Sequence, residues 1–141
     1  MYKEITVPYQ GKYTEFQSTV VNEILVWIEM NLTNRLLLDD IALKSGYTKW
    51  HLQRVFRKVV GIPLGEYIRR RRICEAAKDL CTTDLQVIDI ALKYQFDSQQ
   101  SFAKRFRAYL GTSPSIYRIS GESQNDPLLL EPKVAWYAIW K

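Results

Sequence analysis

Two short segments of the chain carry amide, cationic and aromatic side chains in close succession. These residues are Trp50, Gln53 and Arg54 in the first segment, and Gln99, Gln100, Ser101 and Lys104 in the second. Glutamine and arginine or lysine match the adenine and guanine edges in the DNA major groove, and an aromatic ring can contact a thymine methyl group. We therefore predict that all of these side chains contact DNA bases.

Helical periodicity predicts that both sets face solvent. In a helix, the apolar side chains of each segment fall on one face and the polar ones fall nearly opposite. The apolar stripes are Leu52, Val55, Phe56 and Val59 in the first segment, and Phe102, Phe106, Tyr109 and Leu110 in the second. Trp50 falls on the polar side, which favours a contact with DNA. The alternative is that its ring covers a neighbouring helix.

Both segments belong to a repeated unit. The tetrapeptide Ile-Ala-Leu-Lys occurs at residues 41–44 and again at 90–93, an offset of 49 residues. A second pattern recurs at an offset of 50, as Gln53–Arg57 before Gly61 and as Ala103–Arg107 before Gly111. The repeat predicts one helix-turn-helix unit written twice, with a one-residue slip between its helices. Such a chain has two recognition helices.

The elements expected around these segments are all helices. Cap residues, glycines and apolar spacing place them at 18–32, around 41–43 ending at Gly46, and then at 49–60, 63–80, 87–92, 98–110 and from Pro114. The expected N-caps are Ser18 or Thr19 for the first helix, Thr48 for the third and Asp97 or Ser98 for the sixth.

The predicted fold class is all-α, with about seven helices in two helix-turn-helix subdomains joined by a long central helix. A short irregular C-terminal extension follows. The expected boundaries are 1–17 for an N-terminal arm, 18–62 and 83–118 for the two subdomains, 63–82 for the linker helix and 119–141 for the extension.

The positive charge is concentrated where the repeat lies. The chain of 141 residues has a net charge of +5 and a pI of about 9.2. Residues 49–118 hold 14 basic and 6 acidic side chains, whereas the segments before and after are slightly negative. This distribution indicates an anionic partner at the repeat. We expect that partner to be double-stranded DNA.

Further polar and basic residues can meet the DNA backbone. Residues near a helix start lie where backbone N–H groups attract phosphate. The predicted phosphate contacts are Thr48, Lys49 and His51 at such a start, with Arg57 and Arg107 on the two polar faces. The four arginines 69–72 spread over most of a helix circumference and form no single patch. One or two of them can meet phosphate, and the others are expected to be solvated or ion-paired.

Other chemistry has little support in the sequence. We find no nucleophile–base pair, metal-ligand cluster or phosphate-binding loop, so no enzyme activity, metal or cofactor is expected. Cys74 and Cys81 stand seven residues apart on a predicted helix and are expected to be buried free thiols. We expect no signal peptide and no membrane span.

Several blocks of the sequence resemble the AraC/XylS family of bacterial transcription activators, in its small MarA/SoxS/Rob subgroup. The blocks are Gly46–Arg54, Tyr67–Arg69 and Phe96–Phe102, with Pro114 through Arg118 behind them. The resemblance covers about residues 18–118. It implies a cytoplasmic, nucleoid-associated monomer that recruits RNA polymerase at stress, efflux and antibiotic-resistance promoters. Its two recognition helices would enter successive major-groove faces of a degenerate site of about 20 base pairs.

By position, the resemblance assigns base contacts to the seven residues Trp50, Gln53, Arg54, Gln99, Gln100, Ser101 and Lys104. It assigns phosphate contacts to Lys49, His51, Arg69 and Arg118. Three residues depart from the subgroup pattern. Lys104 stands where arginine is usual, Leu37 where a capping serine is usual, and Gln95 where a turn glycine is common. The first change turns a bidentate guanine contact into a point-charge contact.

A sequence-specific transcription activator is therefore the first hypothesis. A non-specific architectural protein would carry the same charge, but phosphate binding needs no paired glutamines. A third hypothesis is a ligand- or partner-sensing fragment of a longer regulator, with the apolar and aromatic tail at 127–141 forming its pocket.

Overall fold

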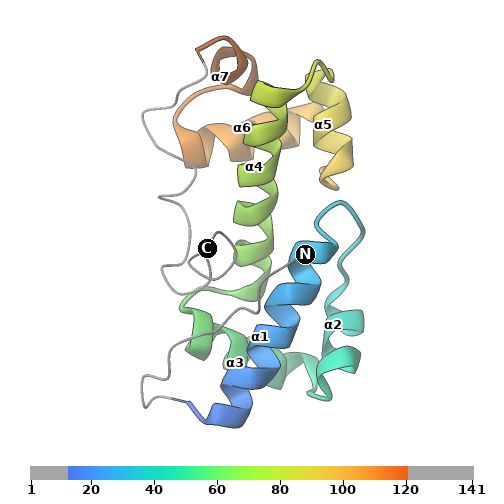
Figure 1. Ribbon diagram of the computed structural model, residues 1–141, viewed down its shortest axis with the longest axis vertical. Coiled ribbons are helices and arrows are strands. Elements are labelled where there is room, and N and C mark those ends of the chain that lie inside the picture. Colours follow the sequence, from blue (N-terminus) through green and yellow to red (C-terminus); the bar gives the residue numbers. More distant parts are fainter. Residues whose placement is uncertain (1–12, 121–141) are drawn as a thin grey trace. The chain divides into compact units, whose positions relative to one another are not determined.

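The computed structural model describes residues 13–120 of the chain. Within that range it contains seven helices and no strand, as the sequence predicts (Figure 1). The described residues fall into two compact units, 13–31 with 36–68 and 32–35 with 69–120. The expected N-terminal arm lies mostly outside this range, and the C-terminal extension lies almost wholly outside it. None of the described helices is both long and apolar enough to cross a membrane.

The first unit is a small three-helix core. Helices α1 (Glu15–Met30) and α2 (Leu38–Ser45) both pack against α3 (Lys49–Val60). Its fully buried side chains come from all three helices, and among them are Ile24, Ile28, Ile41, Leu52 and Phe56. The Phe56 ring meets Tyr67, from the start of α4 (Leu64–Thr82), edge-on at 5.7 Å between ring centroids. This core holds α3 by one face only and leaves its polar face open.

The start of α1 differs from the expectation. The predicted caps Ser18 and Thr19 were wrong: α1 begins at Glu15 and Thr14 is its N-cap. The Thr14 hydroxyl accepts a hydrogen bond from the Gln17 N–H at 3.0 Å, and the Gln17 side chain accepts one from the Thr14 N–H at 3.1 Å. This reciprocal capping box satisfies two otherwise unpaired donors, so the helix starts one turn earlier. Ser18 is buried within the helix.

The second unit is built around the rest of α4. Helices α5 (Val87–Lys93) and α6 (Gln99–Leu110) pack together, and α7 (Pro114–Ser120) packs against α6. An aromatic chain forms the centre of the unit: Phe102 lies 5.2 Å from Phe96 and 5.6 Å from Phe106, and Phe106 lies 5.3 Å from Tyr117, between ring centroids. Edge-on and tilted ring contacts of this kind add to the stabilisation from burial. As in the first unit, the core holds only one face of the longer helix.

The two halves of the repeat have the same local limits. Thr48 caps α3 and Ser98 caps α6, each by accepting the backbone N–H three residues later. Gly61 and Gly111 end these helices with φ angles of 95° and 76°, in the left-handed region that favours glycine. The predicted limits of both helices are confirmed. Leu37 is the N-cap residue of α2 and its apolar side chain makes no capping hydrogen bond.

The two cysteines differ from the expectation that both are buried. Cys74 is buried and free, whereas Cys81 is free and exposed. Periodicity places the two residues close in angle, but Cys81 lies in the last turn of α4, beyond Leu80, the last buried residue of that helix. The prediction of a buried Cys81 was therefore wrong.

The turn between α5 and α6 carries a residue in a strained conformation. Gln95 has a φ of 67°, the only positive φ of a non-glycine residue among those described. Its side-chain amide donates a hydrogen bond to the Thr33 carbonyl at 2.8 Å, within the second unit. The altered turn expected from the absence of glycine is present. The side chain supplies a contact that glycine could not make.

Replacing Gln95 should separate these two effects. Gln95→Ala keeps the strain and loses the hydrogen bond, so it should lower the free energy of unfolding by roughly 1 kcal/mol. Gln95→Gly loses the same bond but relieves the strain, and should be more stable than the alanine variant by about 1–2 kcal/mol. Urea denaturation followed by circular dichroism measures both values. An alanine variant at least as stable as the glycine variant would contradict the strain.

Candidate nucleic-acid interface

Helix α3 presents the first predicted base-reading set to solvent. Leu52, Val55 and Phe56 are buried, so the opposite face of the helix is fixed outward. Trp50, Gln53 and Arg54 lie on that exposed face, together with Arg57. Trp50 is 66% exposed, which excludes the alternative that its ring covers a neighbouring helix. An exposed aromatic ring beside glutamine and arginine side chains can contact thymine methyl groups in the major groove.

Trp50 and Arg54 contact each other on this face. They stand four residues apart, and the guanidinium carbon of Arg54 lies 4.5 Å from the centroid of the Trp50 ring. A cation over an indole face at this distance is attracted by the ring quadrupole. The stacking restricts the rotamers of Arg54 while leaving its N–H groups free to point outward. The sequence indicated both residues, but only the structure shows that they act as a pair.

The start of α3 carries the predicted phosphate contacts Thr48, Lys49 and His51, all exposed. The ring centroids of His51 and Tyr47 lie 4.6 Å apart. The backbone N–H of His51 donates a hydrogen bond to the Thr48 hydroxyl. Lys49 forms an ion pair with Asp39 of α2, at 2.8 Å between Nζ and Oδ1. The hydrogen bond to Asp39, helped by its charge, raises the pKa of Lys49 above the usual value. Sequence reasoning missed Asp39 because the pair joins two different helices.

Asp39 should therefore weaken the hold of Lys49 on DNA. Because an exposed ion pair is worth at most about 1 kcal/mol, Asp39→Asn should raise affinity for all duplexes by roughly two- to fivefold at low salt. Fluorescence anisotropy with a preferred and a scrambled duplex measures the change. Asp40→Asn is the matched control, since Asp40 is an exposed neighbour with the same charge. An equal gain from both variants would mean that net charge alone is responsible.

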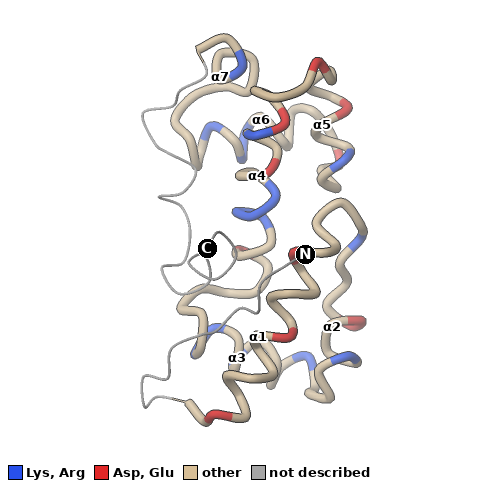
Figure 2. Tube along the Cα trace, viewed as in Figure 1, with Lys and Arg blue, Asp and Glu red and all other residues tan. Residues whose placement is uncertain are grey.

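Helix α6 presents the second set in the same way. Phe102, Phe106 and Leu110 are buried. The polar residues Gln99, Gln100, Ser101, Lys104 and Arg107 are all exposed. Tyr109, predicted as core, is only half-buried, and Arg70 lies over its ring at 5.8 Å from the centroid. Figure 2 shows Lys and Arg along both α3 and α6, each within its own unit.

The arginines of α4 divide as the helical spread predicts. Arg71 is buried and pairs with Glu75 at 2.8 Å, and Arg72 donates to the carbonyls of Leu32 and Asn34 at 3.0 and 2.8 Å. Burial lowers the pKa of Arg72 from its usual value. Both side chains therefore have structural partners. The phosphate role suggested for the half-buried Arg69 stays a prediction.

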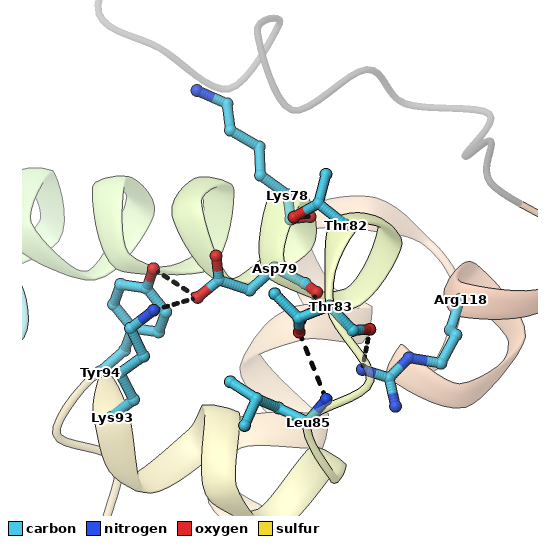
Figure 3. Close-up of polar contacts among 8 residues, drawn as sticks. All are labelled: Lys78, Asp79, Thr82, Thr83, Leu85, Lys93, Tyr94 and Arg118. Carbon is cyan, nitrogen blue, oxygen red and sulfur yellow. Dashed lines mark hydrogen bonds and ion pairs between the residues drawn. The ribbon is translucent and has the colours of Figure 1, made fainter.

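Arg118 also has a structural role. Its guanidinium donates from Nε to the Leu80 carbonyl at 2.9 Å. It also donates from Nη2 to the Thr83 carbonyl at 3.3 Å (Figure 3). These carbonyls stand at the C-terminal end of α4, where a cation is favoured by the helix dipole. Its predicted phosphate contact is not tested by these bonds.

Among the described residues, no group of three or more potential metal ligands comes together.

A basic, exposed helix preceded by a shorter helix across a tight turn, present in each of two units, defines a helix-turn-helix DNA-binding protein. A family model described as a helix-turn-helix domain matches residues 41–120. The HTH-type transcriptional activator AarP of Providencia stuartii is 76% identical over 135 residues, which are 96% of this chain and all of AarP. The chain thus belongs to the AraC/XylS family of transcription activators, in its MarA/SoxS/Rob subgroup.

Other relatives and solved structures agree with this membership. The transposon Tn10 TetD protein of Escherichia coli is 54% identical over 104 residues, covering 74% of this chain and 75% of TetD. The DNA-binding domain of AdpA, solved in complex with a target DNA, superposes with a TM-score of 0.66 at 26% identity, over 71% of this chain and 90% of that one. By their names, AarP is a transcriptional activator and AdpA is a global transcriptional factor.

Proposed function

We propose that this protein is a sequence-specific activator that binds a degenerate site of about 20 base pairs as a monomer. Helices α3 and α6 would enter successive major-groove segments, and the bound protein would recruit RNA polymerase. Its targets would be stress and multidrug-resistance promoters, as in the MarA/SoxS/Rob subgroup. It would act in the bacterial cytoplasm at the nucleoid.

The observation that carries the proposal is the exposed set of base-reading side chains on both helices. The set includes Trp50, Gln53 and Arg54 on α3 and the paired Gln99 and Gln100 on α6. A protein that bound only phosphate would need charge but no such side chains. This difference favours a sequence-specific regulator over an architectural one.

Fluorescence anisotropy tests the DNA-binding part of the proposal. The purified full chain is titrated against a duplex carrying a binding site of the subgroup and against a scrambled duplex, at several salt concentrations. We expect a preference of roughly a thousandfold together with a steep salt dependence. Equal affinity for both duplexes would favour the architectural alternative and sink sequence-specific binding.

The remaining parts need separate measurements. Sedimentation of the complex should give one chain per duplex, and two chains would contradict a monomer. Transcription by purified bacterial RNA polymerase from a promoter with the site should rise when the protein is added. A promoter with the scrambled site is the control. Equal transcription from both promoters would contradict recruitment.

A further inference from the structure

A polar cluster in the second unit joins the end of α4 to the end of α5. The Oδ2 atom of Asp79 accepts hydrogen bonds from the Lys93 ammonium at 2.7 Å and from the Tyr94 hydroxyl at 2.8 Å (Figure 3). The Asp79 carboxylate is only 17% exposed, and Tyr94 is buried. Two donors on one partly buried carboxylate make a stronger and more directional link than an exposed surface ion pair.

The α4 side of this link is itself held in place. The Thr83 hydroxyl donates to the Asp79 carbonyl at 2.7 Å. The guanidinium of Arg118, from α7, holds the carbonyls of Leu80 and Thr83. The backbone around Asp79 is thus tied at the end of the helix. Its carboxylate is a fixed point against which α5 can be placed.

The α5 side leads directly into the second recognition helix. Tyr94 is the C-cap residue of α5, Gln95 follows in its left-handed turn, and α6 begins at Gln99. Burial, together with the hydrogen bond to Asp79, raises the pKa of Tyr94, so its hydroxyl remains a donor. With so few residues between the anchored Tyr94 and Gln99, a shift at the end of α5 must move the start of α6. The exposed side chains that start α6 would then lose their alignment.

Among the described residues of the first unit, no carboxylate pairs with the matching lysine. Lys44 is the counterpart of Lys93 in the repeated tetrapeptide, and it lies over the Trp27 ring at 5.8 Å from the centroid. A cation over a ring is a less directional contact than a short ion pair. The carboxylate link therefore belongs to the second unit. Its loss should affect α6 and spare α3.

We propose that Asp79 is a positioning residue for the second recognition helix, acting through Lys93 and Tyr94 to set where α6 begins. Base discrimination by α6 then depends on Asp79, whereas discrimination by α3 does not. This inference rests on the proposed function, because it requires that both helices read bases.

The test compares base preferences position by position. Wild type, Asp79→Ala and Asp79→Asn are each selected against a duplex library with a randomised site, and the bound pool is sequenced. Gln100→Ala and Arg54→Ala identify the positions read by α6 and by α3. Asp84→Ala is the matched control, since Asp84 is an exposed aspartate in the same unit. We expect Asp79→Ala to reduce preference at the α6 positions by about tenfold, with a smaller loss for Asp79→Asn.

The base preferences of the variants show whether Asp79 positions α6. Preferences at the α3 positions should stay unchanged in Asp79→Ala, and Asp84→Ala should match wild type throughout. An equal loss at both sets of positions, or no loss at either, would overturn the positioning role. A wild-type protein without preference at any position would overturn the proposed function and this inference together. That result is distinguishable from failure of the positioning role alone, because it appears in the wild-type protein.

A second measurement does not depend on DNA. Amide hydrogen exchange in the free Asp79→Asn protein should be about tenfold faster at residues 94–99, with exchange in α1 to α3 unchanged. This near-isosteric variant keeps the test valid if Asp79→Ala unfolds. Unchanged exchange at residues 94–99 would contradict the anchor.

Discussion

Arg54→Ala should lower affinity for the preferred site by roughly 1–3 kcal/mol and relax base preference at the position that Arg54 reads. The side chain is exposed, and its guanidinium is already stacked over Trp50 at 4.5 Å. A group held in place before binding loses less entropy when it pairs with a base. Arg54→Ala should therefore lower the affinity mainly for the preferred site. Anisotropy titrations with the preferred site and its single-base variants measure the loss.

Lys49→Ala is the contrasting variant. Lys49 stands at the start of α3 and is predicted to meet phosphate, which carries no base identity. Its removal should weaken binding to all sequences about equally and reduce the salt slope by about one. If the two variants act alike on preferred and random duplexes, the division between base and phosphate contacts is wrong.

The stacked pair makes a further expectation measurable. Trp50→Ala should lower affinity, and part of that loss should be shared with Arg54→Ala. A double-mutant cycle on the preferred duplex should give a coupling of roughly 0.5–1 kcal/mol, the range for an exposed cation over an aromatic ring. Gln53→Ala combined with Arg54→Ala is the comparison pair on the same face. Strict additivity of Trp50 and Arg54 would mean that the stack contributes nothing to recognition.

The largest effect on stability is expected at Glu75. The Arg71 side chain is 1% exposed, and its Nη2 lies 2.8 Å from the Glu75 carboxylate. Removal of one partner of a buried ion pair typically costs 3–5 kcal/mol, because the buried charge that remains loses this favourable contact. Glu75 keeps some exposure, so Glu75→Ala should lower the free energy of unfolding by about 3 kcal/mol. Urea denaturation measures this loss.

Two variants test whether the buried charge of Arg71 causes the loss of stability in Glu75→Ala. Arg71→Met together with Glu75→Ala should recover most of the stability, because an apolar chain of similar length then fills the same space. Glu23→Ala, at an exposed position of α1, should change stability by no more than about 0.5 kcal/mol. A double variant as unstable as Glu75→Ala alone would show that burial of the arginine charge is not the reason.

The limits of α3 and α6 could be predicted from the sequence. Thr48 and Ser98 cap α3 and α6, and Gly61 and Gly111 end them, because each of these signals acts within one helical turn. The exposed faces of both helices follow from the spacing of apolar residues, which have to be buried. The sequence therefore determined the all-α fold class and, through its blocks, the family.

Only the tertiary structure decided which charged side chains have partners within the protein. Four successive arginines have the same local chemistry, yet Arg71 is buried against Glu75 and Arg72 holds the carbonyls of Leu32 and Asn34. Arg118 caps α4 from 35 and 38 residues away, and Asp39 reaches Lys49 from another helix. Such partners depend on how helices pack. Periodicity along one helix gives the direction of a side chain but not what it meets.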